Sequence, residues 1–156
     1  MWLRVFCLFF LTITQFSWAQ DKSDVDISDS YFSATYPMAT SAAGYFSLTN
    51  NGTQRISLTT ILVDEKVADK AGFHQTVMDE GMISMRPMKQ LDINAGETIQ
   101  FQPGGNHIML TGLKRQLAVG DSITVTFKFA ETNDVMQAFK VKARDNGKSG
   151  HHNHSD

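Results

Sequence analysis

The sequence predicts an all-β domain, either a sandwich or a barrel, from two kinds of observation. Apolar and polar residues alternate over several short stretches, which is the period-two pattern of strands with one buried face. Clusters of Asn, Asp and Gly lie between these stretches and favour tight turns. No stretch has a convincing helical periodicity. Many short strands at near-regular intervals are typical of sandwiches and barrels.

The clearest strand is expected near the C-terminal end of the domain, where apolar Ile123, Val125, Phe127 and Phe129 alternate with polar residues. Turn residues separate it from its neighbours and divide the rest of the domain in the same way. Further strands are expected around residues 46–48, 56–63, 99–101 and 139–141. The turns between the strands are expected at Asn50-Asn51-Gly52, Asn94-Ala95-Gly96, Gly120-Asp121 and Thr132-Asn133-Asp134.

Residues 1–19 are predicted to be an export signal that is removed after Ala19. They contain the basic Arg4, an apolar run over residues 5–13 and the small-x-small sequence Ser17-Trp18-Ala19. That run is about half the length needed to cross a bilayer, so we expect no stable membrane insertion. Cys7 lies inside the run and not at the cleavage point, which argues against a lipid-modified N-terminus.

Charge and cysteine content exclude several classes of function. The chain has 14 basic and 16 acidic side chains and no basic cluster, so nucleic-acid binding is not predicted. Because Cys7 is the only cysteine, the mature protein has no thiol. This excludes disulfides, thiol oxidoreductases, cysteine nucleophiles, Cys-ligated zinc and blue-copper centres.

After the signal, residues 20–24 are expected to form a flexible lead-in, residues 25–143 one domain, and residues 144–156 a disordered tail without apolar character. The tail contains His151, His152 and His154. Imidazole-rich tracts can bind Cu(II), which prefers nitrogen and oxygen donors, so these three are a candidate secondary copper site. A solvated tail without function is the alternative interpretation.

Four side chains within the domain form the main candidate site: His74, Met85, His107 and Met109. Two imidazoles and two thioethers make a soft, neutral donor set that suits Cu(I) and suits zinc, calcium or magnesium poorly. Each residue taken alone is more often a packed or surface residue without a ligand role. Both histidines of the domain fall in the pattern, however, and each has a methionine at a strand-compatible distance.

The strand pattern also predicts how these donors converge. On an extended chain His107 and Met109 point to one side, while Ile108 and Leu110 point to the core. Pro103-Gly104-Gly105 allows a bend just before this strand. A hairpin turn centred between Asp79 and Glu80 would place His74 directly opposite Met85, and a shift of the turn by one residue would leave them diagonal.

Three nearby methionines, Met78, Met82 and Met88, are interpreted as packing or exposed residues, although extra thioethers could also form a secondary landing surface for copper.

The sequence resembles the periplasmic copper chaperones of the PCu(A)C family, whose signature is a histidine, a methionine after ten residues, and His-x-Met after twenty-one more. His74, Met85, His107 and Met109 match this signature without a gap. The resemblance extends to Gly44-Tyr45 with Asn50-Asn51-Gly52, and to residues 74–85, 103–110 and 117–129.

This resemblance implies a cupredoxin-like Greek-key β-sandwich or barrel that holds one Cu(I) in the periplasm and is not an enzyme. It further implies delivery of copper to the binuclear centre of cytochrome c oxidase subunit II, together with a thiol-bearing chaperone of the Sco type.

Three rival functions stay open at this point. A copper buffer or resistance protein would use the same site, and a metal-free β-sandwich binding module would leave the His/Met pattern unexplained. A copper oxygenase with an N-terminal histidine brace is disfavoured because no histidine precedes His74. The sequence also has no nucleophile–base constellation typical of hydrolases. We expect a monomer.

Overall fold

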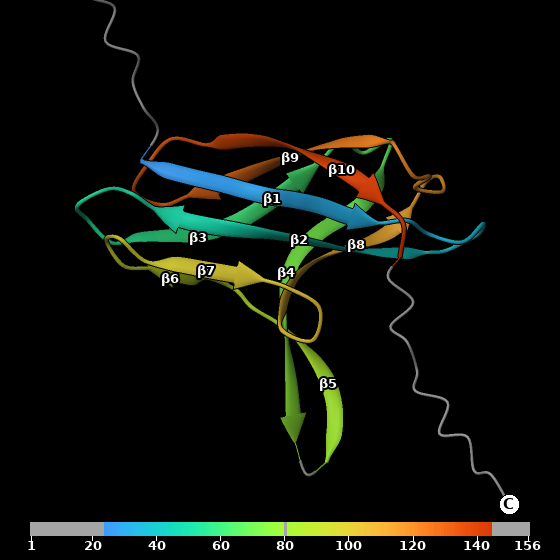
Figure 1. The fold of residues 1–156 in the computed structure, drawn as a ribbon, viewed down its shortest axis with the longest axis horizontal. Helices are drawn as coiled ribbons and strands as arrows, with labels where there is room; N and C mark the ends of the chain where they lie inside the picture. The colour runs from blue at the N-terminus through green and yellow to red at the C-terminus, as the bar shows by residue number, and fades with distance from the viewer. Residues whose placement is uncertain (1–23, 80, 145–156) are drawn as a thin grey trace, which may run out of the picture.

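A computed structural model describes residues 24–79 and 81–144, which form ten β-strands and no helix (Figure 1). Within this part of the chain there is accordingly no helix long and apolar enough to cross a membrane. The predicted export signal and almost all of the lead-in and the tail lie outside the described residues. The strands are β1 (Val25–Ser33), β2 (Ser41–Asn50), β3 (Ile56–Val63), β4 (Ala68–Asp79), β5 (Met82–Pro87), β6 (Leu91–Ile93), β7 (Thr98–Phe101), β8 (Asn106–Leu113), β9 (Ser122–Phe129) and β10 (Val135–Lys142).

The strands form one mixed sheet in the order β5-β4-β8-β7-β2-β1-β10-β9-β3-β6, folded into a cupredoxin-like sandwich. The first half of β2 pairs with β8 and its second half pairs with β7. A parallel pairing of β1 with β10 joins the two layers, and most other pairings are antiparallel. The predicted fold class is therefore confirmed.

Aromatic side chains from both layers fill the space between them. Phe46 of β2 packs against Phe127 of β9 and Phe139 of β10, with ring centroids 5.1 and 5.7 Å apart. Phe127 is completely buried, as the alternation around residues 123–129 predicts, and Phe139 of β10 is completely buried as well. Burial of such large apolar side chains is the main stabilising contribution to this layer packing.

Asn50 anchors the first predicted turn because its side chain is fully buried and makes three hydrogen bonds. Its Nδ2 donates to the carbonyl oxygens of Gln54 and Ile93, at 2.8 and 3.1 Å. Its Oδ1 accepts a hydrogen bond of 3.0 Å from the backbone N–H of Gly52. The predicted turns at 94–96 and 120–121 contain Gly96 and Gly120 at positive φ, a conformation that glycine adopts without steric cost.

The β4–β5 hairpin extends beyond the body of the sandwich (Figure 1). Strand β4 pairs with β8 from Ala68 to Gln75 and with β5 from His74 to Asp79. Beyond Gln75, β5 is its strand partner. All six residues of β5 are exposed. We call residues 76–79 and 81–86 the hairpin arm.

The predicted register of this hairpin is wrong by one position on each strand. Met85 lies opposite Thr76, and His74 lies opposite Pro87. The turn includes Gly81, whose φ of 79° is readily accessible to glycine, and so it lies one residue later than predicted. His74 and Met85 are therefore diagonal neighbours and not direct partners.

Candidate metal centre

All four predicted donors lie on the same outer face of the β5-β4-β8 layer. His74 pairs with His107, and Met109 pairs with Gly72, which is two residues before His74 on β4. Met85 pairs with Thr76, which is two residues after His74. Cross-strand partners share a face, and residues two apart on a strand share a face as well. The fold thus brings together residues that are up to 35 positions apart in the sequence.

On β8 the opposite face is the core, as the sequence predicts. Ile108 and Leu110 are completely buried, and Met109 between them is half-buried on the outer face. His107 is more buried than its outer position suggests, with only 5% of its surface exposed. A polar ring buried to this extent requires partners for its two nitrogens.

Only one nitrogen of His107 has a partner within the described part of the chain. Nδ1 lies 3.1 Å from the carbonyl oxygen of Gly105, and because a carbonyl only accepts, Nδ1–H is the donor. In the neutral ring this leaves the lone pair on Nε2, which is buried and has no hydrogen-bond partner there. A carbonyl that fixes the tautomer in this way is a common support for a metal-ligating histidine.

His74 lies beside His107 across the two strands. Their rings are stacked, with centroids 5.9 Å apart and planes inclined by 19°. Nδ1 of His74 is also buried without a hydrogen-bond partner among the described residues. Burial lowers the pKa of the His74 imidazole, and the neighbouring His107 lowers it further, against an opposing contribution from the Gly72 carbonyl. The neutral ring, which is the form that binds a metal, is therefore favoured.

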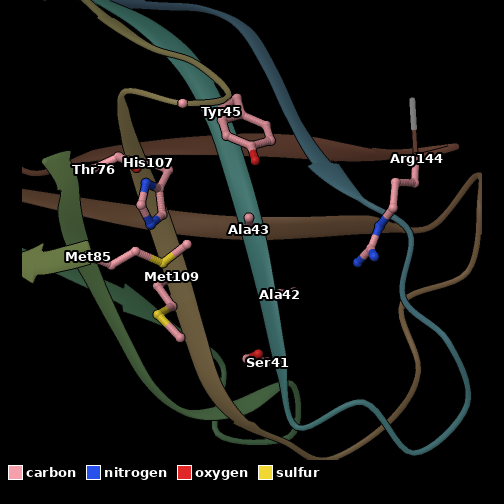
Figure 2. Close-up of a pocket in the computed structure, with 10 residues that line it drawn as sticks. Ser41, Ala42, Ala43, Tyr45, Thr76, Met85, His107, Met109 and Arg144 are labelled. Atoms are coloured by element: carbon pink, nitrogen blue, oxygen red, sulfur yellow. The ribbon is translucent and has the colours of Figure 1, made fainter. Parts of the chain in front are cut away.

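The thioethers of Met85 and Met109 lie next to the His107 ring and face the same space (Figure 2). That space is a pocket of about 200 Å³. Small residues of β2 form part of its wall, since Ala43 pairs directly with Met109. Met109 is half-buried, whereas Met85 is 61% exposed and leaves one side of the site open to solvent.

This arrangement offers two imidazole nitrogens and two thioether sulfurs, all of them neutral. Nowhere in residues 24–79 and 81–144 do three or more His, Cys, Asp or Glu side chains lie together in a way that could hold a metal. Thioether sulfurs are poor ligands for a hard cation or a structural zinc ion. A soft monovalent ion such as Cu(I) matches the donors that are present.

The sequence did not indicate several other residues around the pocket. Thr76 could have been found, because it is two residues from His74 and shares its face. Tyr45 of β2 and Arg144, which follows β10, also line the pocket, where the fold brings together distant parts of the chain. The candidate Cu(II) residues His151, His152 and His154 lie outside the described residues.

Comparison with known proteins agrees with this interpretation of the fold. A family described as "Putative lipoprotein LpqE-like" matches residues 25–141. A protein of Leifsonia xyli named "Putative lipoprotein Lxx21020" is 33% identical over 119 residues, which cover 76% of this chain and 69% of that protein.

Two solved structures share the fold. The solution structure of the Cu(I) form of DR1885 from Deinococcus radiodurans has a TM-score of 0.64 and is 30% identical, covering 83% of this chain and 85% of that one. The copper-bound PCuAC domain of PmoF2 also has a TM-score of 0.64, over 78% of this chain and 94% of that one. At 17% identity the second match shows the fold alone. The predicted family resemblance is confirmed by these matches.

Proposed function

The chain belongs to the LpqE-like/PCuAC family, and from this premise we propose that it is an exported, non-catalytic chaperone for one Cu(I) ion. His74, Met85, His107 and Met109 bind the ion. The observation that carries the proposal is the convergence of the four donors on one face, where the buried nitrogens His74 Nδ1 and His107 Nε2 have no hydrogen-bond partner among the described residues. Unpaired buried nitrogens are costly, and a metal ion would satisfy them.

The donor set also suits a protein that releases Cu(I) to a partner better than one that retains the ion. Neutral nitrogen and thioether ligands leave the positive charge of Cu(I) uncompensated, and thioethers bind Cu(I) less strongly than thiolates do. Met85 is largely exposed, so an incoming ligand can reach the ion from solvent without unfolding the site. A partner with two cysteines can therefore take the ion by stepwise ligand exchange.

The recipient that we propose is the binuclear copper centre of cytochrome c oxidase subunit II, with a Sco-type chaperone as the thiol-bearing partner. The resemblance to PCu(A)C chaperones supports this assignment, and the similarity to the Cu(I) form of DR1885 supports copper binding. Transfer between proteins requires only a transient complex, and we propose that the chaperone itself is a monomer.

Titration of the reduced protein with Cu(I) against a chromogenic chelator tests the binding site. We expect one bound equivalent, and we expect it to be lost or strongly weakened in His107→Ala and Met109→Ala. Gln75→Ala is a matched control, because Gln75 adjoins His74 on β4 and faces the other side. Tight Cu(I) binding that survives both donor substitutions would contradict the proposed site.

A deletion strain tests the proposed recipient. We expect cytochrome c oxidase activity to fall when the gene is deleted and to recover when copper is added to the medium. Normal oxidase activity combined with sensitivity to excess copper would instead identify a buffer or resistance protein that uses the same site.

We further propose that the C-terminal tail captures Cu(II) through His151, His152 and His154, before reduction and transfer to the main site. The imidazole-rich composition of residues 151–154 supports this step. Deletion of residues 147–156 is expected to remove Cu(II) binding and to leave Cu(I) binding unchanged. Unaltered Cu(II) stoichiometry after the deletion would disprove it.

Export to the periplasm with cleavage after Ala19 completes the proposal. The names of the family and of the Leifsonia protein contain the word lipoprotein, which fits an exported protein. In this chain the only cysteine, Cys7, lies within the apolar run and not beside the small-residue site. Mass spectrometry of the mature protein is expected to give an unmodified N-terminus at Gln20, and a lipid-modified N-terminus would contradict this.

A further inference from the structure

The hairpin arm exposes an unusual number of large apolar side chains. Met78, Met82, Ile83 and Met85 are each between 61 and 75% exposed, although they lie within a short segment. The other methionine of this region, Met88, is half-buried and packs against the core. Exposed apolar side chains that gather in one place on a small domain often mark a functional surface.

The register of the hairpin arm separates these residues into two faces. Met78 is two residues beyond Thr76 and four beyond His74, so it lies on the face of the candidate metal centre. Its partner Ile83 lies on that face as well, two residues before Met85. Met82 pairs with Asp79 and lies on the reverse face, where Asp79 forms an ion pair of 2.9 Å with Arg86.

Met78 is therefore a diagonal neighbour of Met85, displaced toward the tip of the hairpin arm. Diagonal neighbours on antiparallel strands have Cα atoms about 7–8 Å apart. Methionine has three rotatable side-chain bonds and a polarizable sulfur, so two such side chains can bring their thioethers to one ion. Neither side chain has to leave a packed environment to do so, since Met78 is 75% exposed and Met85 is 61% exposed.

We propose that Met78 and Met85 form an outer Cu(I) position through which the ion leaves the four-donor site. This inference rests on the proposed function of that site. In the exchange, the bonds from Cu(I) to His74, His107 and Met109 break in turn, and a bond to the Met78 sulfur forms. All of these ligands are neutral and the ion stays monovalent, so no electron or proton needs to be supplied. Met85 stays bound during the step and links the inner position to the outer one.

The outer position makes the ion more accessible to a partner. The inner site includes His107, which is 5% exposed, whereas both sulfurs of the outer position belong to side chains that are mostly exposed. An incoming thiolate can therefore attack Cu(I) held by Met78 and Met85 with less steric hindrance. Met78 thereby accelerates transfer without adding to the equilibrium affinity of the inner site.

The test compares Met78→Leu with the control Met82→Leu. Leucine keeps the apolar volume and removes the sulfur, and Met82 matches Met78 in exposure but lies on the reverse face. Both substituted side chains are exposed on the hairpin arm, so we expect the two variants to fold like the wild type. Titration with Cu(I) against bicinchoninate is expected to give one equivalent and unchanged affinity for the wild type and both variants.

Transfer kinetics supply the decisive measurement. The loaded proteins are mixed with a synthetic peptide that contains two cysteines, and the ultraviolet band of the Cu(I)–thiolate product is followed by stopped flow. We expect Met78→Leu to slow transfer by about tenfold, equivalent to about 1.4 kcal/mol in the barrier, and Met82→Leu to transfer at the wild-type rate. Methyl resonances of the methionines give a second measurement, in which Cu(I) perturbs Met78 and leaves Met82 unchanged.

The possible failures are distinguishable. A wild-type protein that binds no Cu(I) would overturn the proposed function itself. One bound equivalent with unaltered transfer in Met78→Leu would overturn only the outer position. Equal slowing in both variants would also overturn it, because the effect would then come from apolar contact along the whole hairpin arm and not from one thioether.

Discussion

The body of the sandwich and the hairpin arm follow opposite rules for the placement of apolar side chains. In the body, strands such as β9 bury alternate residues between the two layers, and large side chains such as Phe127 and Phe139 are fully enclosed. In the arm, Met78 and Ile83 pair across the strands while both stay largely exposed. The apolar residues of the arm therefore contribute little to folding, which leaves them available for binding.

The candidate metal centre lies where these two regions meet. His107 and Met109 belong to β8, a strand of the body, and they are at least half-buried. Met85 belongs to the arm and is exposed. A site built in this way combines a buried nitrogen donor with an exposed sulfur donor, which suits the proposed role of a carrier.

The largest expected effect is a loss of stability in the body. Phe139→Ala removes a ring that contacts Phe32 and Phe46 and is completely buried, so we expect unfolding to become easier by about 3–5 kcal/mol. Ile83→Ala in the arm is the comparison and is expected to change stability by less than about 0.5 kcal/mol. Urea denaturation measures both values. Similar losses in the two variants would show that the arm is packed in solution.

The affinity for Cu(I) should depend mainly on the donors at the junction of body and arm. His107→Ala is expected to lower the affinity for Cu(I) by about a hundredfold or more, equivalent to about 2.7 kcal/mol. Competition with bicinchoninate gives this ratio, and Met136→Leu, an exposed substitution on β10, serves as the control. A loss below about threefold would exclude His107 as a ligand.

Close packing of the body also predicts a cost for added volume. A Cβ atom on Gly44 would overlap Cε1 of Phe32, so Gly44→Ala forces that buried ring to move. We expect a destabilisation of about 1–3 kcal/mol. At Gly72, on β4 at the root of the arm, the nearest atom to such a Cβ would be His74 Cε1 at 3.6 Å, an ordinary contact. Thermal melting of Gly44→Ala and Gly72→Ala should therefore show a clear difference in Tm.

The pH dependence sharpens the comparison at His74. Its pKa is lowered from the ordinary value of 6.5, chiefly by burial, so the folded copper-free protein binds a proton less readily than the unfolded chain. Protonation of His74 therefore does not lower the free energy of unfolding above pH 6.5, and it lowers that free energy as the pH falls below 6.5. A proton NMR titration of the imidazole should give a midpoint below 6.5. We also expect Cu(I) affinity to hold down to about pH 6.5 and to decline below it.

An affinity for Cu(I) that stays constant from about pH 7 to 5 would argue against histidine ligation, because protons compete with the metal for imidazole nitrogens and not for thioethers.

The smallest effect is expected from the ion pair on the reverse face of the arm. Asp79 and Arg86 are 65 and 62% exposed, and exposed pairs contribute about 0.2–1 kcal/mol. Arg86→Gln should therefore change the free energy of unfolding by less than about 1 kcal/mol and should leave Cu(I) affinity unaltered. Because Arg86 lies on the face opposite the donors, a large loss of copper affinity would mean that the register of the hairpin is different in solution.

The sequence predicted the strands more reliably than their pairing. The alternation around Ile123 and the turn at Asn50 are local patterns, and β9 and the loop after β2 follow them. The hairpin register depended on one turn type, which the sequence around Asp79 does not determine. Because the register is shifted by one residue on each strand, Met85 lies opposite Thr76 and not opposite His74. Met85 is still a diagonal neighbour of His74, as expected for a shifted turn.

By itself, the sequence determined the donor chemistry and the outward face of His107 and Met109, because period-two alternation is a property of any single strand. Only the tertiary structure decided that His74 pairs with His107 and that Met78 shares the face of the donors while Met82 does not. It also decided that His107 Nε2 is buried with no partner in residues 24–79 and 81–144. These features depend on pairing between strands that are distant in sequence and on the register of one turn, and neither is encoded in local alternation.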